Sequence, residues 1–190
     1  MKVIRAQRAG FCMGVDLALC KLNDLIENTA ERGAIFILGS IIHNPQVVRE
    51  YAEKGIVTVH SPEEIPTGST VVIRAHGIAK EIQDELSSRG VHVVDATCPK
   101  VAAACLLIER HTADGRTLLL YGEEAHPEVK CLLSYAAGDA IVFDSRDKCE
   151  ALQLDPSQKY CLAAQTTQDK DIFGAIIKSL QDREELDVTI

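Results

Sequence analysis

Two of the seven cysteines in this chain lie in similar contexts, which makes them candidates for binding a metal. Cys12 lies in the segment GFCMGV and Cys98 in the segment DATCPKV, and each separates a short apolar run from a predicted helix. The positive end of a helix dipole stabilises a thiolate, which is the form of cysteine that binds metals. We interpret the other cysteines as small buried residues; they are Cys20, Cys105, Cys131, Cys149 and Cys161.

Three histidines recur in step with these two cysteines and indicate an anion pocket. His43 precedes Asn-Pro 31 residues after Cys12, and His126 precedes Pro-Glu 28 residues after Cys98. His76 precedes a glycine farther along the first half of the chain. Imidazole nitrogens donate hydrogen bonds to phosphate oxygens, and a dianionic group favours their protonation. The sequence therefore predicts a site for a phosphate-like anion beside the thiolates.

A carboxyl group and a hydroxyl group complete the candidate site. Glu128 falls in the first turn of a predicted helix, where it is either a helix-start charge or, in a closed anionic pocket, a proton donor. Thr166 follows a predicted strand, and capping the next helix is the simpler role for its hydroxyl.

Composition excludes several classes of protein. The chain has 190 residues, 46% of them hydrophobic, which is enough for one large or two small domains. Its formal net charge of -8 argues against nucleic-acid binding by phosphate neutralisation. It has neither an apolar run long enough to span a membrane nor an export signal, and its cysteines are widely scattered. We therefore expect a reduced, cytoplasmic protein.

Short β-rich runs alternate with amphipathic stretches, which predicts an α/β fold of βαβ units with mainly parallel sheets. The predicted strands are Lys2–Ala6, Ala34–Leu38, Ile56–Val59, Thr70–Ala75, Val91–Asp95, Thr117–Tyr121, Ala140–Phe143, Tyr160–Ala164 and Asp187–Ile190. The predicted helices are Val15–Ala30, Pro45–Lys54, Lys80–Ser88, Lys100–Thr112, Pro127–Ala136 and Gln168–Asp182. We expect two similar domains, residues 1–96 and 97–190, with the candidate side chains in one cleft at the carboxyl ends of the strands.

Six motifs occur in a fixed order along the chain: GFCxGV, HNPxVV, AHG, DATCPxV, HPEV and QTT. Together they closely resemble the N-terminal two-thirds of the LytB/IspH family of 4-hydroxy-3-methylbut-2-enyl diphosphate reductases. The resemblance implies three similar α/β domains in a trefoil-like arrangement around a central [4Fe-4S] cluster. It also implies the last step of the methylerythritol phosphate pathway of isoprenoid biosynthesis. In that step the allylic hydroxyl is removed reductively, which gives isopentenyl and dimethylallyl diphosphates.

The resemblance also implies roles for the candidate residues. Cys12 and Cys98 correspond to two of three cluster ligands, and Glu128 to the acid of a proton relay that Thr166 orients. The contacts to the substrate correspond to His43, His76 and His126. The electrons would come from a donor protein such as ferredoxin or flavodoxin. Glu123 and Glu124 differ from many relatives, and we expect them to face solvent because carboxylates would repel a diphosphate.

By the same resemblance, a third cluster cysteine would lie in a third domain, a few residues beyond Ile190. We therefore expect the cluster to be absent or incomplete in these 190 residues, and an uncovered domain interface to favour self-association. Two other classes stay open. One is an inactive binding or assembly module with a partial diphosphate pocket, and the other is a redox-sensing protein whose thiols hold no cluster.

Overall fold

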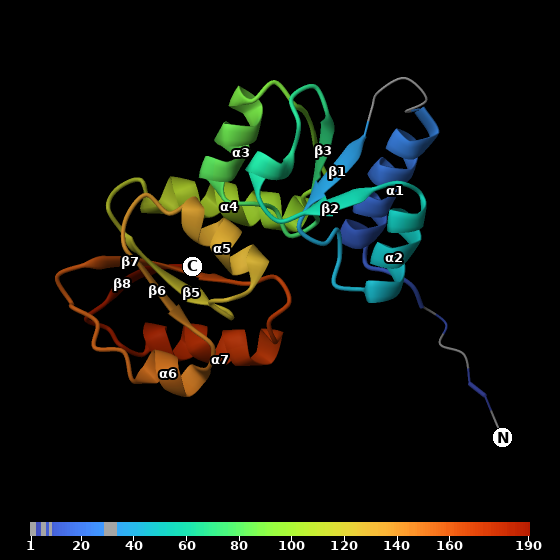
Figure 1. The fold of residues 1–190 in the computed structure, drawn as a ribbon. Coiled ribbons are helices and arrows are strands. Elements are labelled where there is room, and N and C mark those ends of the chain that lie inside the picture. Colours follow the sequence, from blue (N-terminus) through green and yellow to red (C-terminus); the bar gives the residue numbers. More distant parts are fainter. Residues whose placement is uncertain (1–2, 5–6, 8, 29–33) are drawn as a thin grey trace.

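Two four-stranded sheets covered by helices make up the computed structural model, which describes residues 3–4, 7, 9–28 and 34–190 (Figure 1). The first half contains α1 (Met13–Asn28), β1 (Ile35–Leu38), α2 (Pro45–Glu53), β2 (Val57–Val59), η1 (Pro62–Glu64), β3 (Thr70–Ile73), α3 (Lys80–Ser88) and β4 (His92–Asp95). The second contains α4 (Pro99–Thr112), β5 (Thr117–Tyr121), α5 (Pro127–Ser134), β6 (Ala140–Phe143), α6 (Arg146–Glu150), β7 (Lys159–Ala164), α7 (Lys170–Gln181) and β8 (Asp187–Thr189). Every strand pair in the described ranges is parallel, which confirms the predicted α/β class.

The second sheet repeats the strand order of the first. The orders are β2-β1-β3-β4 and β6-β5-β7-β8, so each strand has a counterpart four strands later. The helices that open the two halves also correspond: α1 packs Leu22 into a core with β1, and α4 packs Ile108 into a core with β5. This repetition supports two similar units, and the boundary at residues 96 and 97 stays a prediction.

The inner strands of each sheet consist mostly of hydrophobic residues, as expected where helices cover both faces. Strands β1, β3 and β5 are buried at every residue, as expected for the inner strands of a parallel sheet. Each sheet therefore has two hydrophobic clusters, one per face; Leu120 of β5 points into one cluster and Leu119 into the other.

Two short helices were not predicted from the sequence. Helix α6 has five residues, and η1 has three, too few for a hydrophobic period to be visible. Their start signals are polar: the hydroxyl of Ser145 accepts a hydrogen bond from the backbone of α6, and Ser61 and Glu64 form a capping box at η1. The strand predicted over Lys2–Ala6 lies partly outside the described residues, and its described part, residues 3–4, is not in a strand.

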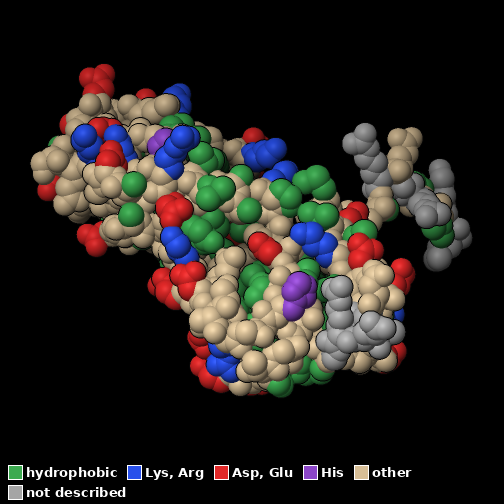
Figure 2. All heavy atoms as spheres, turned by 90° about the horizontal axis from the view of Figure 1, so that it is seen from above, with side chains coloured by type: hydrophobic (Ala, Val, Ile, Leu, Met, Phe, Trp, Pro, Cys, Tyr) green, Lys and Arg blue, Asp and Glu red, His purple; other side chains and the backbone are tan. Residues whose placement is uncertain are grey.

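The two halves meet where α3 of the first contacts α5 of the second. The backbone N–H of Lys80 donates to Ser134 Oγ at 3.0 Å, and its ammonium group pairs with Glu109 of α4. Figure 1 shows α4 between the two sheets. On the face shown in Figure 2, basic and acidic side chains are interspersed, and apolar ones gather between the two ends. None of the helices in the described ranges has the length and apolar character needed to cross a bilayer.

We expect Leu119→Ala to lower the free energy of unfolding by about 2–5 kcal/mol, because this fully buried residue of β5 would leave a cavity. Leu107→Ala is the matched control, because this leucine of α4 is 53% exposed; its effect should stay within about 0.5 kcal/mol. Urea unfolding followed by circular dichroism measures both. Equal effects would mean that β5 is not a core strand.

Candidate functional site

The two candidate metal ligands occupy equivalent places at the starts of α1 and α4. The carbonyl oxygen of Cys12 accepts a hydrogen bond from Asp16 N at 2.9 Å, and that of Cys98 accepts one from Ala102 N at 3.0 Å. Each cysteine therefore precedes the first helical residue, and the predicted equivalence holds at this level. Cys98 follows β4 directly, whereas the chain before Cys12 is not in a strand within the described residues.

A glycine brings the starts of these two helices together. A β-carbon on Gly14, two residues after Cys12, would lie 2.5 Å from Cys98 Sγ, so only glycine leaves room for the sulfur. The backbone N–H of Cys98 donates to Ala75 O at 2.9 Å, which places this cysteine beside the strand end that leads to His76. Cys12 is exposed, Cys98 is half-buried, and both are free thiols. Among the other cysteines, the prediction of burial is wrong for Cys20, which lies on the exposed side of α1. Two cysteine sulfurs at helix starts fit part of the thiolate set that holds an iron–sulfur cluster.

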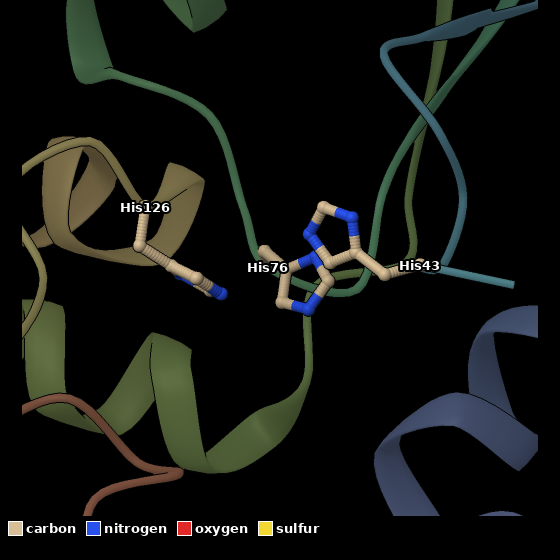
Figure 3. A group of neighbouring side chains, drawn as sticks. All are labelled: His43, His76 and His126. Atoms are coloured by element: carbon tan, nitrogen blue, oxygen red, sulfur yellow. The ribbon is translucent and has the colours of Figure 1, made fainter.

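The three candidate histidines converge at the carboxyl ends of the strands (Figure 3). His43 follows β1, His76 follows β3 and His126 follows β5. Their ring centroids are 4.8 Å apart for His43 and His76, 5.7 Å for His43 and His126, and 5.4 Å for His76 and His126. The structure thus brings together side chains from both halves of the chain. Their role in binding a substrate stays a prediction.

The hydrogen bond at His126 indicates which ligand this cluster suits. His126 Nδ1 accepts a hydrogen bond from Glu128 N at 3.1 Å, so the neutral ring carries its proton on Nε2. The ring points toward His76 and His43 (Figure 3), and Nε2 is therefore a donor toward the centre. One nitrogen from each histidine lies within 4.8 Å of the others, a spacing that could suit a metal ion. A metal ion would need a free lone pair on Nε2 of His126, but in this tautomer Nε2 carries a proton. An anion can accept a hydrogen bond from that N–H group, so the cluster is better suited to an anion.

His76 is the most perturbed histidine of the cluster. Its pKa is lowered from 6.5 to about 4, mainly by burial and then by the neighbouring His43, His126 and Arg74 in that order. Its Nδ1 is buried and has no hydrogen-bond partner among the described residues. A buried polar atom without a partner is costly, so an anion that accepts from this ring would satisfy it and favour its protonation.

Arg74 is a component of the site that the sequence did not reveal. It follows β3 directly, its Nε donates to Gly77 O at 3.3 Å, and its Nη1 fills the space that a β-carbon on Gly39 would take. Burial lowers the pKa of this guanidinium, and within the described part of the chain it forms no ion pair with a carboxylate. Arg74 thus adds an uncompensated positive charge beside His76. Its only sequence signal was its position two residues before that histidine.

The candidate acid is buried and held by the candidate hydroxyl. Glu128 is 1% exposed; its Oε1 accepts from Thr166 N at 2.5 Å, and its Oε2 accepts from Thr166 Oγ1 at 2.9 Å. The simpler role for Thr166, capping the next helix, is wrong, because the carboxylate of Asp169 caps α7. Thr166 itself is exposed, so its hydroxyl connects the buried carboxyl to the surface of the site.

Gln165 holds the loop that carries the two unusual glutamates. Its side-chain Oε1 accepts from Glu123 N at 3.1 Å and lies 3.1 Å from where a β-carbon on Gly122 would be. Gln165 occupies the place after β7 that Arg74 occupies after β3, and each reaches over the glycine that follows the neighbouring strand. Glu123 and Glu124 are both exposed, which confirms the prediction that they face solvent.

Comparison with known proteins identifies the family. The family described as "LytB protein" matches residues 3–189, nearly the whole chain. The chain belongs to the LytB family. A LytB relative from Desulfovibrio desulfuricans, named 4-hydroxy-3-methylbut-2-enyl diphosphate reductase, is 53% identical over 184 residues, which cover 95% of this chain. The chain spans 64% of the length of that relative.

Two solved structures with reductase names share the fold. One, described as (E)-4-hydroxy-3-methyl-but-2-enyl diphosphate reductase, is 34% identical with a TM-score of 0.81, covering 98% of this chain and 66% of its own. The other, E-1-hydroxy-2-methyl-but-2-enyl-4-diphosphate reductase from Plasmodium falciparum, has a TM-score of 0.86 at 21% identity, covering 96% and 57%. The resemblance inferred from the six LytB motifs is confirmed at the level of family and fold.

We expect His76 to titrate at about pH 4 in this LytB chain, because burial opposes its charged form. Between pH 6.5 and 4 the unfolded chain then binds a proton that the folded chain does not, so stability falls as the pH falls through this range. NMR of the histidine rings gives the pKa, and urea unfolding at several pH values gives the slope.

His76→Gln should remove this part of the pH dependence, whereas His92→Gln, at the exposed start of β4, should leave it unchanged. A His76 ring that titrates near 6.5 would mean that the cluster is open to water.

Proposed function

We propose that this chain forms the part of a LytB-family reductase that binds the substrate 4-hydroxy-3-methylbut-2-enyl diphosphate. The same part would donate a proton when the hydroxyl group of the substrate is removed. The products would be isopentenyl and dimethylallyl diphosphates, at the last step of the methylerythritol phosphate pathway. The observation that supports this most is the convergence of three imidazoles beside an arginine that lacks an ion pair within the described residues. The names of the similar proteins supply the substrate.

The diphosphate would lie against the histidine cluster. His126 offers an Nε2–H donor, and the partnerless Nδ1 of His76 gains a hydrogen bond once an anion favours the protonated ring. Arg74 adds charge that is already present before the ligand arrives. The chain carries a net charge of -8, so this positive region is local and would favour an anion only inside the site.

Cys12 and Cys98 would supply two thiolate ligands of a [4Fe-4S] cluster. When bound, such a cluster supplies the electrons of the reduction. Gly14 allows Cys98 to sit against the start of α1, and the hydrogen bond from Cys98 N to Ala75 O fixes this thiol beside the turn of His76. The chain would therefore hold Cys98 beside both the start of α1 and the turn of His76, which brings the candidate thiol ligands and the histidine cluster into one region.

Glu128 would be the proton source. Both of its oxygens contact Thr166, so a proton on Oε2 can pass to the hydroxyl oxygen of Thr166 while that hydroxyl gives its own proton outward. Because Glu128 is buried and Thr166 is exposed, the threonine is the point at which the proton reaches the departing hydroxyl. Because Glu128 is buried, bulk water cannot remove the proton of its carboxyl group in the absence of the substrate.

The remaining parts of the proposal concern partners and location. The electrons would come from a protein such as ferredoxin or flavodoxin. All seven cysteines are free thiols, which supports a reducing compartment such as the cytoplasm. Leu106 and Leu107 of α4 are 63% and 53% exposed and would favour self-association where no further domain covers them.

We expect inorganic pyrophosphate to bind this chain and His126→Ala to weaken that binding about tenfold or more, because a hydrogen bond to a charged group is lost. Isothermal titration calorimetry in magnesium-free buffer measures it. His92→Ala is the matched control, because His92 lies at the opposite end of its strand from the site. Equal weakening by both variants would indicate nonspecific attraction.

We expect Glu128→Gln to lower product formation about 10²–10⁴-fold with little change in pyrophosphate binding, because it removes the acid and keeps the shape. The assay uses a chimaera in which the remaining third of the Desulfovibrio desulfuricans relative follows Ile190, since this chain spans 64% of that relative. The protein is reconstituted with iron and sulfide without oxygen and assayed with a reduced dye.

Thr166→Val should also reduce the rate, because it removes the hydroxyl that passes the proton of Glu128 to the substrate. The loss should be smaller than for Glu128→Gln, since residue 166 is exposed and a water molecule can replace the hydroxyl. Glu128→Gln with full activity would remove this residue from the mechanism. A chimaera that binds pyrophosphate and iron but forms no product would favour the inactive binding module, and binding without any iron would favour thiols that hold no cluster.

A further inference from the structure

Two buried thiols that the proposed function does not use meet at the junction of the two halves. The Sγ atoms of Cys105 in α4 and Cys131 in α5 lie 3.7 Å apart, and the residues are 3% and 2% exposed. Both belong to the hydrophobic cluster that joins these helices to β5. A disulfide requires a sulfur–sulfur distance of about 2.05 Å, so side-chain rotation with a small helix shift can close the gap.

A cavity gives small molecules access to this pair. It has a volume of about 150 Å³, and the residues that line it include Cys105, Cys131, Gly77, Thr97 and Tyr135. That volume is several times the share of one water molecule in the liquid, about 30 Å³. The two thiols are therefore buried from bulk solvent but not sealed from a molecule as small as a peroxide.

The contact also makes one of the two thiols more reactive. Either sulfur can be the donor in this contact; with Cys131 as the donor, the hydrogen bond lowers the pKa of Cys105 and raises that of Cys131. Burial instead raises the pKa of Cys149 and of Cys161, the two other buried cysteines. Because the thiolate is the reactive form, Cys105 is the buried cysteine best able to attack an oxidant.

We propose that Cys105 and Cys131 form a reversible disulfide when hydrogen peroxide enters this cavity. The Cys105 thiol loses its proton and its sulfur attacks a peroxide oxygen; a sulfur–oxygen bond forms, the oxygen–oxygen bond breaks, and the other oxygen takes up that proton and leaves as water. Cys131 sulfur then attacks Cys105 sulfur, and the hydroxyl leaves with the proton of Cys131 as a second water. The thiols lose two electrons, and the peroxide gains them. This inference does not rest on the proposed function.

The disulfide would change the packing beneath the histidine cluster. Cys131 Sγ now lies 2.6 Å from where a β-carbon on Gly77 would be, directly under the turn that follows His76. Bond formation would draw this sulfur toward Cys105 and so alter its contact with the turn. It also ties the helix that starts after Cys98 to the helix that starts after His126.

Peptide mapping of this 190-residue chain tests the proposal. The chain is treated with hydrogen peroxide, quenched, unfolded, alkylated and digested with trypsin without reduction. We expect the peptide of residues 101–110 joined to that of residues 131–146, and we expect dithiothreitol to separate them. Cys105 and Cys131 should lose alkylation together, and faster than Cys149 and Cys161, because the lowered pKa of Cys105 increases its thiolate fraction whereas burial decreases that of the other two.

Cys105→Ser should abolish the joined peptides and leave Cys131 open to alkylation, whereas the matched control Cys161→Ser should retain the link. Circular dichroism checks that both variants fold. If either variant does not fold, the peptide map of the wild-type chain tests the proposal by itself. Equal oxidation rates at all four buried cysteines, or linkage of Cys131 to any other cysteine, would overturn the proposal.

Discussion

A sulfur atom occupies the space that a side chain would take at each of two glycines, and the site depends on these two contacts. Cys98 Sγ fills the space beside Gly14, and Cys131 Sγ fills the space beside Gly77. In the first contact the start of α1 meets the start of α4, and in the second a turn of the first half meets α5 of the second. A methyl group at either glycine would lie too close to the sulfur, so the sulfur or the backbone beside it would have to move.

Around these contacts, the two parallel sheets bring distant residues to one place. The loops that leave β1, β3 and β5 carry one histidine each, and the loop after β7 carries Thr166. Burial separates the polar groups by character: Glu128 is enclosed and bonded to Thr166, whereas Glu123 and Glu124 face water. An acidic chain thereby keeps its negative charge away from a small basic region, which is what binding an anion requires.

Much of this arrangement could be predicted from the sequence, because it follows from local patterns. Apolar runs indicate inner strands, and residues that directly follow such strands must lie at one edge of a parallel sheet, which is why the meeting of His43, His76 and His126 was foreseeable. The contact of Cys105 with Cys131 was not, because it depends on how two helices cross, and each cysteine by itself resembles an ordinary core residue. Arg74 was missed for a related reason: only the folded chain shows that no described carboxylate pairs with it.

One difference between the two halves would affect the orientation of a bound ligand. Arg74 extends over Gly39 at the end of the first sheet, and Gln165 extends over Gly122 at the matching point of the second. The backbone geometry is duplicated, but one arm ends in a cation and the other in a neutral amide. A ligand with a charged head and an uncharged tail would therefore meet two similar walls of unequal potential. This difference in charge would favour one orientation of such a ligand over the other.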